Sequence, residues 1–162
     1  MYSSFKKCQQ QLADVAAVDY FFAKECLSVI NTHSKLDESQ QNILFHILIK
    51  LINSYSLGHS CEIVENIAGK TFFDSKEELM KGYKTPEYND LVALLDLLNY
   101  ENLPIYYAKE LDSLYIKRLW LYENETAKFI NANLAIKQLD IQNLKTIVDS
   151  LFDQSDETDW QK

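Results

Sequence analysis

The sequence predicts a mainly α-helical fold with a small antiparallel β-hairpin, organised as a winged-helix-like core with flanking helices. Residues 39–57 form a long, mostly apolar segment of helical length. Thr85-Pro86-Glu87 is a helix-start signal, and two β-prone runs follow it at 105–108 and 114–117. The chain has 162 residues, of which 47% are hydrophobic, so it can build one core without a disulfide or a structural metal.

The first third of the chain is expected to hold two helices joined by a polar loop. Residues 19–31 begin with Asp19, which can cap a helix, and continue with a run of aromatic residues. The second helix, at 39–57, is expected to be buried on most sides, because eight of the ten residues from 43 to 52 are apolar. Gly58 stands where a C-terminal cap belongs.

The segment that follows is expected to be short and irregular. Residues 59–63 are predicted to form a strand, and residues 64–68 a single helical turn that ends at Gly69. Residues 70–84 are rich in Lys and Glu and show no clean period. We therefore expect a loop there, with a short helix around 76–80.

A third helix and a hairpin complete the expected core. Thr85 is the predicted cap of a helix at 86–100, with Pro86 at its first position. The strands 105–108 and 114–117 lack an Asn-Gly turn, so a longer loop is expected between them. A three-stranded sheet would join this hairpin to the strand at 59–63. This order of helices and strands is that of a winged helix.

Two further helices are expected after the hairpin. The first covers 119–134. The second covers 140–152, where apolar residues recur at near-helical spacing: Ile141, Leu144, Ile147, Val148, Leu151 and Phe152. The tail at 153–162 is acidic before it reaches Trp160-Gln161-Lys162.

The charge balance argues against a phosphate-binding function. The net charge is −8, Arg118 is the single arginine, and the chain has three glycines. No glycine-rich phosphate loop can be written with these residues, so we expect no ATP hydrolysis by this chain. A winged helix that reads DNA would carry basic or amide side chains on its second long helix. Residues 86–101 instead hold four acidic residues and no Lys or Arg, so DNA reading is a minor alternative.

Other candidate sites have plain structural explanations beside the functional ones. Tyr106 and Tyr115 are expected to share one face of the hairpin, as part of the core or as an aromatic contact patch for a partner protein. His46 is expected to be a satisfied core histidine. His59 and Cys61 supply only two of the four ligands of a structural zinc site, so no metal is expected and Cys61 is expected to face the core.

The expected location is cytoplasmic. The three cysteines are widely spaced, as in reduced proteins of the cytosol, and the N-terminus lacks a secretory signal. No apolar stretch approaches the length of a membrane span.

Three segments of the chain together resemble a known family. They are Gly58-His59-x-Cys61 with Ile67-Ala68-Gly69, then Leu114-Tyr115-Ile116-x-Arg118-x-Trp120-x-Tyr122-Glu123 continuing to Ala127 and Phe129, and finally Asp156-Glu157-x-x-Trp160-Gln161-Lys162. In this order and at about this spacing, they resemble the N-terminal domain of RecD, the alpha subunit of bacterial exodeoxyribonuclease V. The similarity runs from about Asp19 to Lys162, and the second segment is its most specific part.

The resemblance implies a role that the residue patterns alone do not reach. The full RecD subunit is an ATP-dependent helicase moving 5′ to 3′, inside a three-subunit helicase–nuclease that processes double-strand breaks for recombination. Its N-terminal domain is held against the gamma subunit (RecC), with the beta subunit in the same complex. Gln161 resembles the glutamine that contacts adenine just before the phosphate loop. ATP and Mg²⁺ would then bind only in the complete subunit, and DNA only through its motor domains.

On this resemblance, we expect residues 1–153 to be a non-catalytic docking domain and residues 154–162 to begin the motor domain. The chain ends at Lys162, before any helicase motif, as a chain cut at the domain boundary would. Two alternatives remain open: a free-standing winged-helix adaptor or regulatory protein, and a DNA-binding accessory domain.

Overall fold

The computed structural model describes residues 2–77, 79–98, 100–136 and 146. The chain divides into two units, Met1–Glu123 and Asn124–Lys162, and each is described by itself. The expected helix at 140–152, apart from the helical Thr146, and the tail at 153–162 lie outside the described residues.

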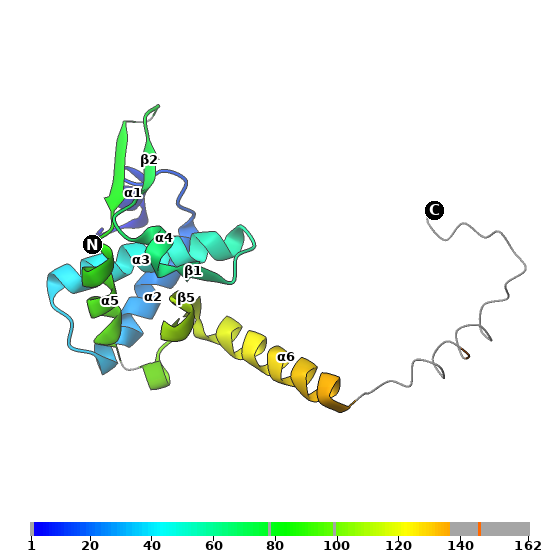
Figure 1. The fold of residues 1–162 in the computed structure, drawn as a ribbon. Coiled ribbons are helices and arrows are strands. Elements are labelled where there is room, and N and C mark those ends of the chain that lie inside the picture. The colour runs from blue at the N-terminus through cyan, green and yellow to red at the C-terminus, as the bar shows by residue number, and fades with distance from the viewer. Residues whose placement is uncertain (1, 78, 99, 137–145, 147–162) are drawn as a thin grey trace, which may run out of the picture. The chain divides into compact units, whose positions relative to one another are not determined.

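The described part of the chain is mainly helical, and it contains a small antiparallel hairpin, as predicted; a second small antiparallel sheet was not predicted. The helices are α1 (Phe5–Gln9), α2 (Ala17–His33), α3 (Glu38–Ser56), α4 (Val64–Ile67), α5 (Tyr88–Asp96) and α6 (Lys117–Ile136), with 3-10 turns at Tyr100–Asn102 and Lys109–Leu111. The strands are β1 (Cys61–Ile63), β2 (Thr71–Ser75), β3 (Met80–Lys84), β4 (Ile105–Ala108) and β5 (Ser113–Ile116) (Figure 1). None of the described helices is both long enough and apolar enough to cross a bilayer.

Helix α3 is the centre of the first unit. It begins with a reciprocal cap: Asp37 Oδ1 accepts from the Gln40 amide at 2.8 Å, and Gln40 Oε1 accepts from the Asp37 amide at 2.9 Å. Every residue from Leu44 to Ile49 is buried, so no side of this stretch faces solvent. A helix that is apolar on nearly all sides has to be covered by other elements.

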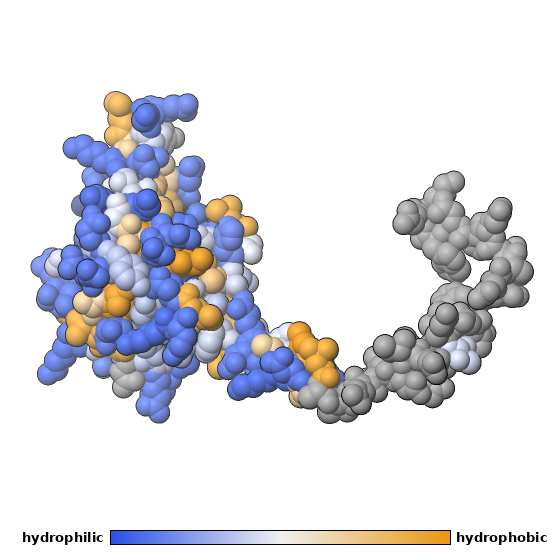
Figure 2. All heavy atoms as spheres, in the orientation of Figure 1, coloured by the Kyte–Doolittle hydropathy of each residue, from blue (hydrophilic) through white to orange (hydrophobic). Residues whose placement is uncertain are grey.

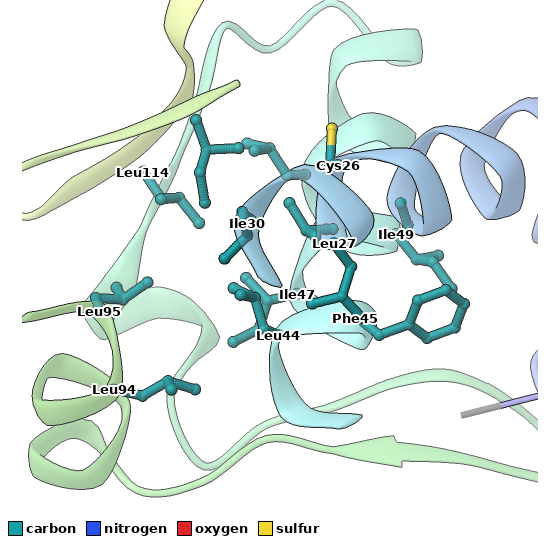
Figure 3. Close-up of a cluster of buried hydrophobic side chains, with 14 of the residues drawn as sticks. Cys26, Leu27, Ile30, Leu44, Phe45, Ile47, Ile49, Leu94, Leu95 and Leu114 are labelled. Atoms are coloured by element: carbon teal, nitrogen blue, oxygen red, sulfur yellow. The ribbon is translucent and has the colours of Figure 1, made fainter. Parts of the chain in front are cut away.

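The cover comes from α2, α5 and the three-stranded sheet. Figure 3 shows side chains of α2, α3, α5 and β5 converging in one cluster, including Ile30, Leu44, Leu95 and Leu114, each of which is fully buried. Helix α2 packs along α3 and contributes Ala23, Cys26, Leu27 and Ile30 at helical spacing. The hydrophobic core is therefore continuous from the first long helix to the hairpin.

The expected three-stranded sheet is present, with strand order β1-β5-β4. Cys61 pairs with Tyr115 across β1 and β5, and Tyr106 pairs with Tyr115 across β4 and β5. The connection between β4 and β5 is a 3-10 turn followed by Asp112 in the left-handed conformation, at φ 46°. The prediction of a loop longer than two residues is confirmed.

The prediction of a loop with a short helix at 70–84 is wrong. Residues 71–75 and 80–84 form the antiparallel hairpin β2–β3, which projects from the helices in Figure 1. Phe72 and Tyr83 form a cross-strand pair that packs on the core. The strand pattern is not visible in the sequence for two reasons. The segment is rich in Lys and Glu, and positive φ angles at Phe73 and Gly82 interrupt the alternation of side chains along the strands.

Two predicted helix caps are also corrected. Asp19 lies one turn inside α2, where its Oδ2 accepts from the Ala16 amide at 2.9 Å, and Ala16 occupies the cap position. Thr85 is buried, and its hydroxyl donates to the backbone carbonyls of Ile67 and Lys70 instead of capping a helix. Helix α5 consequently begins at Tyr88, after the cap residue Glu87, and it ends at Asp96, short of the expected end at residue 100.

Gly82 is the position where the hairpin tolerates no side chain. A Cβ there would lie 2.4 Å from the Phe72 carbonyl oxygen and 2.7 Å from the Asp74 amide nitrogen, and φ is +65°. We expect Gly82→Ala to lower the free energy of unfolding by about 1–3 kcal/mol, measured by urea denaturation. Gly58→Ala is the control, since φ there is +93° but no atom lies within 4 Å of its Cβ. An equal or larger loss for Gly58→Ala would contradict the close approach at Gly82.

Candidate protein-binding surface

His46 is a satisfied core histidine, as predicted. Its ring is 4% exposed, with Nδ1 2.7 Å from the Asn42 carbonyl oxygen and Nε2 3.1 Å from the Tyr2 hydroxyl. A carbonyl can only accept, so Nδ1 carries the proton and Nε2 accepts from Tyr2. Tyr83 stacks on the ring with centroids 3.7 Å apart, which fixes the β2–β3 hairpin to α3. His46 is thus a packing residue with no free ring nitrogen.

Burial lowers the pKa of His46 to about 4, against the hydrogen bond to Asn42, which raises it. The unfolded chain therefore takes up a proton near pH 6.5, before the folded chain does. Stability is lost as the pH falls from 6.5 towards 4. Between pH 7 and pH 5, protonation of His46 in the unfolded chain lowers the free energy of unfolding by about 2 kcal/mol. We expect the free energy of unfolding of His46→Gln, measured by urea denaturation, to fall about 2 kcal/mol less than that of the wild type between pH 7 and pH 5. Parallel profiles for the two proteins would contradict the assignment.

The two tyrosines predicted as interface candidates lie beside Trp120 of α6. Tyr106 stacks on Trp120 with ring centroids 4.9 Å apart and an interplanar angle of 20°, and Tyr115 lies 5.3 Å from the same ring. Tyr115 is only 5% exposed, so it takes the core alternative, whereas Tyr106 is half-buried. Burial, followed by the hydrogen bond to Cys61, raises the pKa of Tyr115 to about 12. This aromatic cluster anchors the start of α6 to the sheet.

A groove lies where the start of α6 meets the two long helices, and we call it the docking groove. It has a volume of about 470 Å³. Helices α2 and α3 supply Val18, Phe22, Ile52, Tyr55 and Ser56, and β5 and α6 supply Ile116, Arg118, Leu119 and Tyr122. An adjoining hollow of about 450 Å³ shares Phe22, Ile116, Arg118 and Tyr122 and extends to Leu103, Pro104, Lys117 and Leu121.

Large hydrophobic side chains stand exposed around the docking groove. Val18 is 63% exposed, Tyr55 and Tyr122 are each 51% exposed, and Leu121 is 46% exposed. Contiguous apolar surface of this kind marks binding sites for proteins and ligands, whereas single exposed apolar residues do not. Figure 2 shows hydrophobic residues scattered among hydrophilic ones over the visible face. Leu79, between β2 and β3, is 89% exposed and does not line the docking groove.

Two cationic side chains, Lys117 and Arg118, border the docking groove and its adjoining hollow, and they differ in their partners. Lys117 Nζ donates to the backbone carbonyl oxygen of Tyr100 at 2.6 Å and to that of Glu101. Arg118 Nε donates to the Tyr122 hydroxyl at 2.8 Å, and the guanidinium carbon lies 5.3 Å from the Tyr122 ring centroid. Across the described residues, no carboxylate forms a salt bridge with Arg118. The charge at this groove is therefore available to a partner.

Hydrogen bonds of Asp112 hold the loop between β4 and β5 in place. Asp112 Oδ1 accepts from the Tyr107 hydroxyl at 2.9 Å and from the Tyr88 hydroxyl at 3.1 Å, while Oδ2 accepts from the Glu65 amide at 2.9 Å. Burial, followed by the hydrogen bond to Asp112, raises the pKa of Tyr107. These bonds tie the loop to α4 and α5, so the polar groups of Asp112 are spent within the fold.

The remaining candidates do not assemble into a chemical site. His59 is exposed and Cys61 is half-buried beside Tyr115. Within the described part of the chain, no three His, Cys, Asp or Glu side chains come together as metal ligands do. Gln161, the candidate adenine contact, lies outside the described residues.

The docking groove itself was not predicted from the sequence. Its walls come from residues 18–22, 52–56 and 116–122, which only the fold brings together. A partial signal exists in α6, where Leu119 and Tyr122 share one face while Trp120 points to the sheet. Trp120 therefore packs against the sheet, whereas its neighbour Leu121 is exposed and lines the adjoining hollow.

Trp120 and Leu121 make a matched pair for testing that division. We expect Trp120→Ala to lower the free energy of unfolding by about 2 kcal/mol, because it removes the stack on Tyr106 and the contact with Tyr115. Leu121→Ala should change it by less than about 0.5 kcal/mol, since that side chain is exposed. Urea denaturation measures both. Equal losses would contradict the anchoring role of Trp120.

No family model, no curated protein and no solved structure matches this chain.

Proposed function

We propose that the chain is a non-catalytic protein-docking module, and that it is the N-terminal domain of a RecD-like helicase subunit of exodeoxyribonuclease V. The docking groove is the observation that carries the docking role, because it combines exposed apolar walls with an arginine that forms no salt bridge to a described carboxylate. The sequence resemblance carries the choice of partner, which is the gamma subunit, within a cytoplasmic complex that also contains the beta subunit. ATP, Mg²⁺ and DNA would be bound by the motor domains of the complete subunit.

The proposed core is a winged helix with an insertion. In chain order, α3, β1, α4, α5, β4 and β5 follow the winged-helix sequence of elements, and β1 joins the hairpin in one sheet. The hairpin β2–β3 is then an insertion between α4 and α5, and the loop at 109–112 is the wing. The wing is short and tied to α5 by the Lys109–Asp96 ion pair at 2.7 Å, which supports a structural role for it.

The charge of α5 supports protein contact over DNA contact in this core. Helix α5 occupies the place of a DNA-reading helix, yet it contains Asp90 and Asp96 and no Lys or Arg. Phosphate neutralisation needs cations on the docking element. A salt-sensitive gel shift by residues 1–162 at low ionic strength would instead favour the DNA-binding alternative.

The docking proposal is tested with the whole chain and the gamma subunit of the same organism. We expect the double variant Val18→Ser/Leu121→Ser to weaken binding by at least about tenfold in isothermal titration, because two exposed apolar contacts are lost at the docking groove. Leu97→Ser/Leu111→Ser is the matched control, since these leucines are 58% and 56% exposed and lie away from the groove.

The outcomes separate the parts of the proposal. Binding that is weakened only by the groove variant supports the docking role. Equal binding by wild type and groove variant would place the interface elsewhere and overturn the role of the groove. An absence of any binding to the gamma subunit would overturn the RecD-like assignment.

A further inference from the structure

We propose that the docking groove receives an apolar segment of the partner protein that carries an Asp or Glu, and that Arg118 pairs with that carboxylate. This inference rests on the proposed docking function and names the chemistry of the partner segment. Apolar walls alone would accept any hydrophobic segment, whereas a single charged group among them selects for its complement.

The first argument is that the groove and the adjoining hollow together have the space and the apolar walls for a short peptide segment. Val18, Phe22 and Ile52 supply aliphatic and aromatic walls, and the adjoining hollow continues the surface past Leu121. Arg118 lines both hollows, so a segment that occupied both would contact this residue.

The second argument is that Arg118 is held in place before any partner arrives. Its Nε donates to the hydroxyl of Tyr122, one helical turn along α6, and its guanidinium carbon lies 5.3 Å from the Tyr122 ring centroid. This leaves the two terminal amino groups without a hydrogen bond to any described residue. A planar, oriented pair of N–H groups matches the two oxygens of a carboxylate.

The third argument is the contrast with the neighbouring cation. Lys117 is consumed by two backbone carbonyl oxygens at the 3-10 turn of Tyr100–Asn102, so it serves the fold. Arg118 is the single arginine of the chain, and no described acidic residue forms a salt bridge with it. The carboxylate that it fits is therefore best supplied by the partner.

The experiment measures binding of the whole chain to the gamma subunit for three variants of Arg118. We expect Arg118→Gln to raise the dissociation constant about tenfold, because the charge-assisted pair is lost. Arg118→Glu should raise it further by repulsion, and Arg118→Lys should recover only part of the affinity, since an ammonium cannot bind both oxygens in one plane. Lys24→Gln is the control for net charge, because Lys24 is exposed on α2 and does not line the groove.

The salt dependence adds a second readout. As the ionic strength rises, the affinity of the wild type for the gamma subunit should fall more steeply than the affinity of Arg118→Gln. Thermal unfolding of each variant checks the fold, which should be unchanged because Arg118 is exposed.

Three outcomes are distinguishable. The graded order wild type, Lys, Gln, Glu with an unaffected Lys24→Gln supports the inference. Binding that is weakened by Val18→Ser/Leu121→Ser but unchanged in Arg118→Gln would overturn the carboxylate pairing and leave the docking function standing. Wild-type protein that does not bind the gamma subunit would overturn both.

Discussion

The whole first unit depends on removing one helix from water. Six consecutive residues of α3, from Leu44 to Ile49, are buried, including a histidine that must remain neutral. A helix cannot bury consecutive residues by packing on one side, because six residues cover more than a full turn. Residues of α2, α5, the three-stranded sheet and the β2–β3 hairpin belong to, or pack against, the same core cluster. The arrangement of the other elements follows from this requirement.

The docking groove forms where the elements that cover α3 meet near its C-terminal end. Near the C-terminal end of α3, the start of α2 and the start of α6 approach Ile52 and Tyr55 from different directions. Trp120 turns towards Tyr106 and Tyr115 and fixes α6 to the sheet, which leaves Leu119 and Tyr122 on the face that borders the groove. A surface with apolar walls is therefore maintained by core contacts of the residues next to it. The same packing holds Arg118 beside Tyr122.

Sequence reasoning succeeded where one element shows a strong local pattern. The apolar run of α3 and the β-prone segments of β4 and β5 were identifiable because the residue types within each segment are sufficient to indicate its structure. It failed at β2–β3, where positive φ angles at Phe73 and Gly82 break the alternation and lysines dominate the composition. It also failed at Thr85, whose hydroxyl bonds to carbonyls distant in sequence. The groove could not be predicted, since its three walls are separated by about 30 and 60 residues and meet only in the folded chain.

The central claim is that this acidic chain works by protein contact at the docking groove. Hydrogen–deuterium exchange of residues 1–162, with and without the gamma subunit, tests it most directly because it reads every segment at once. The account predicts that the partner slows exchange in the segments that contain 18–22, 52–56 and 116–122, with no change in α5. Slowed exchange confined to α5 and the 109–112 loop, or no change anywhere in the chain, would contradict it.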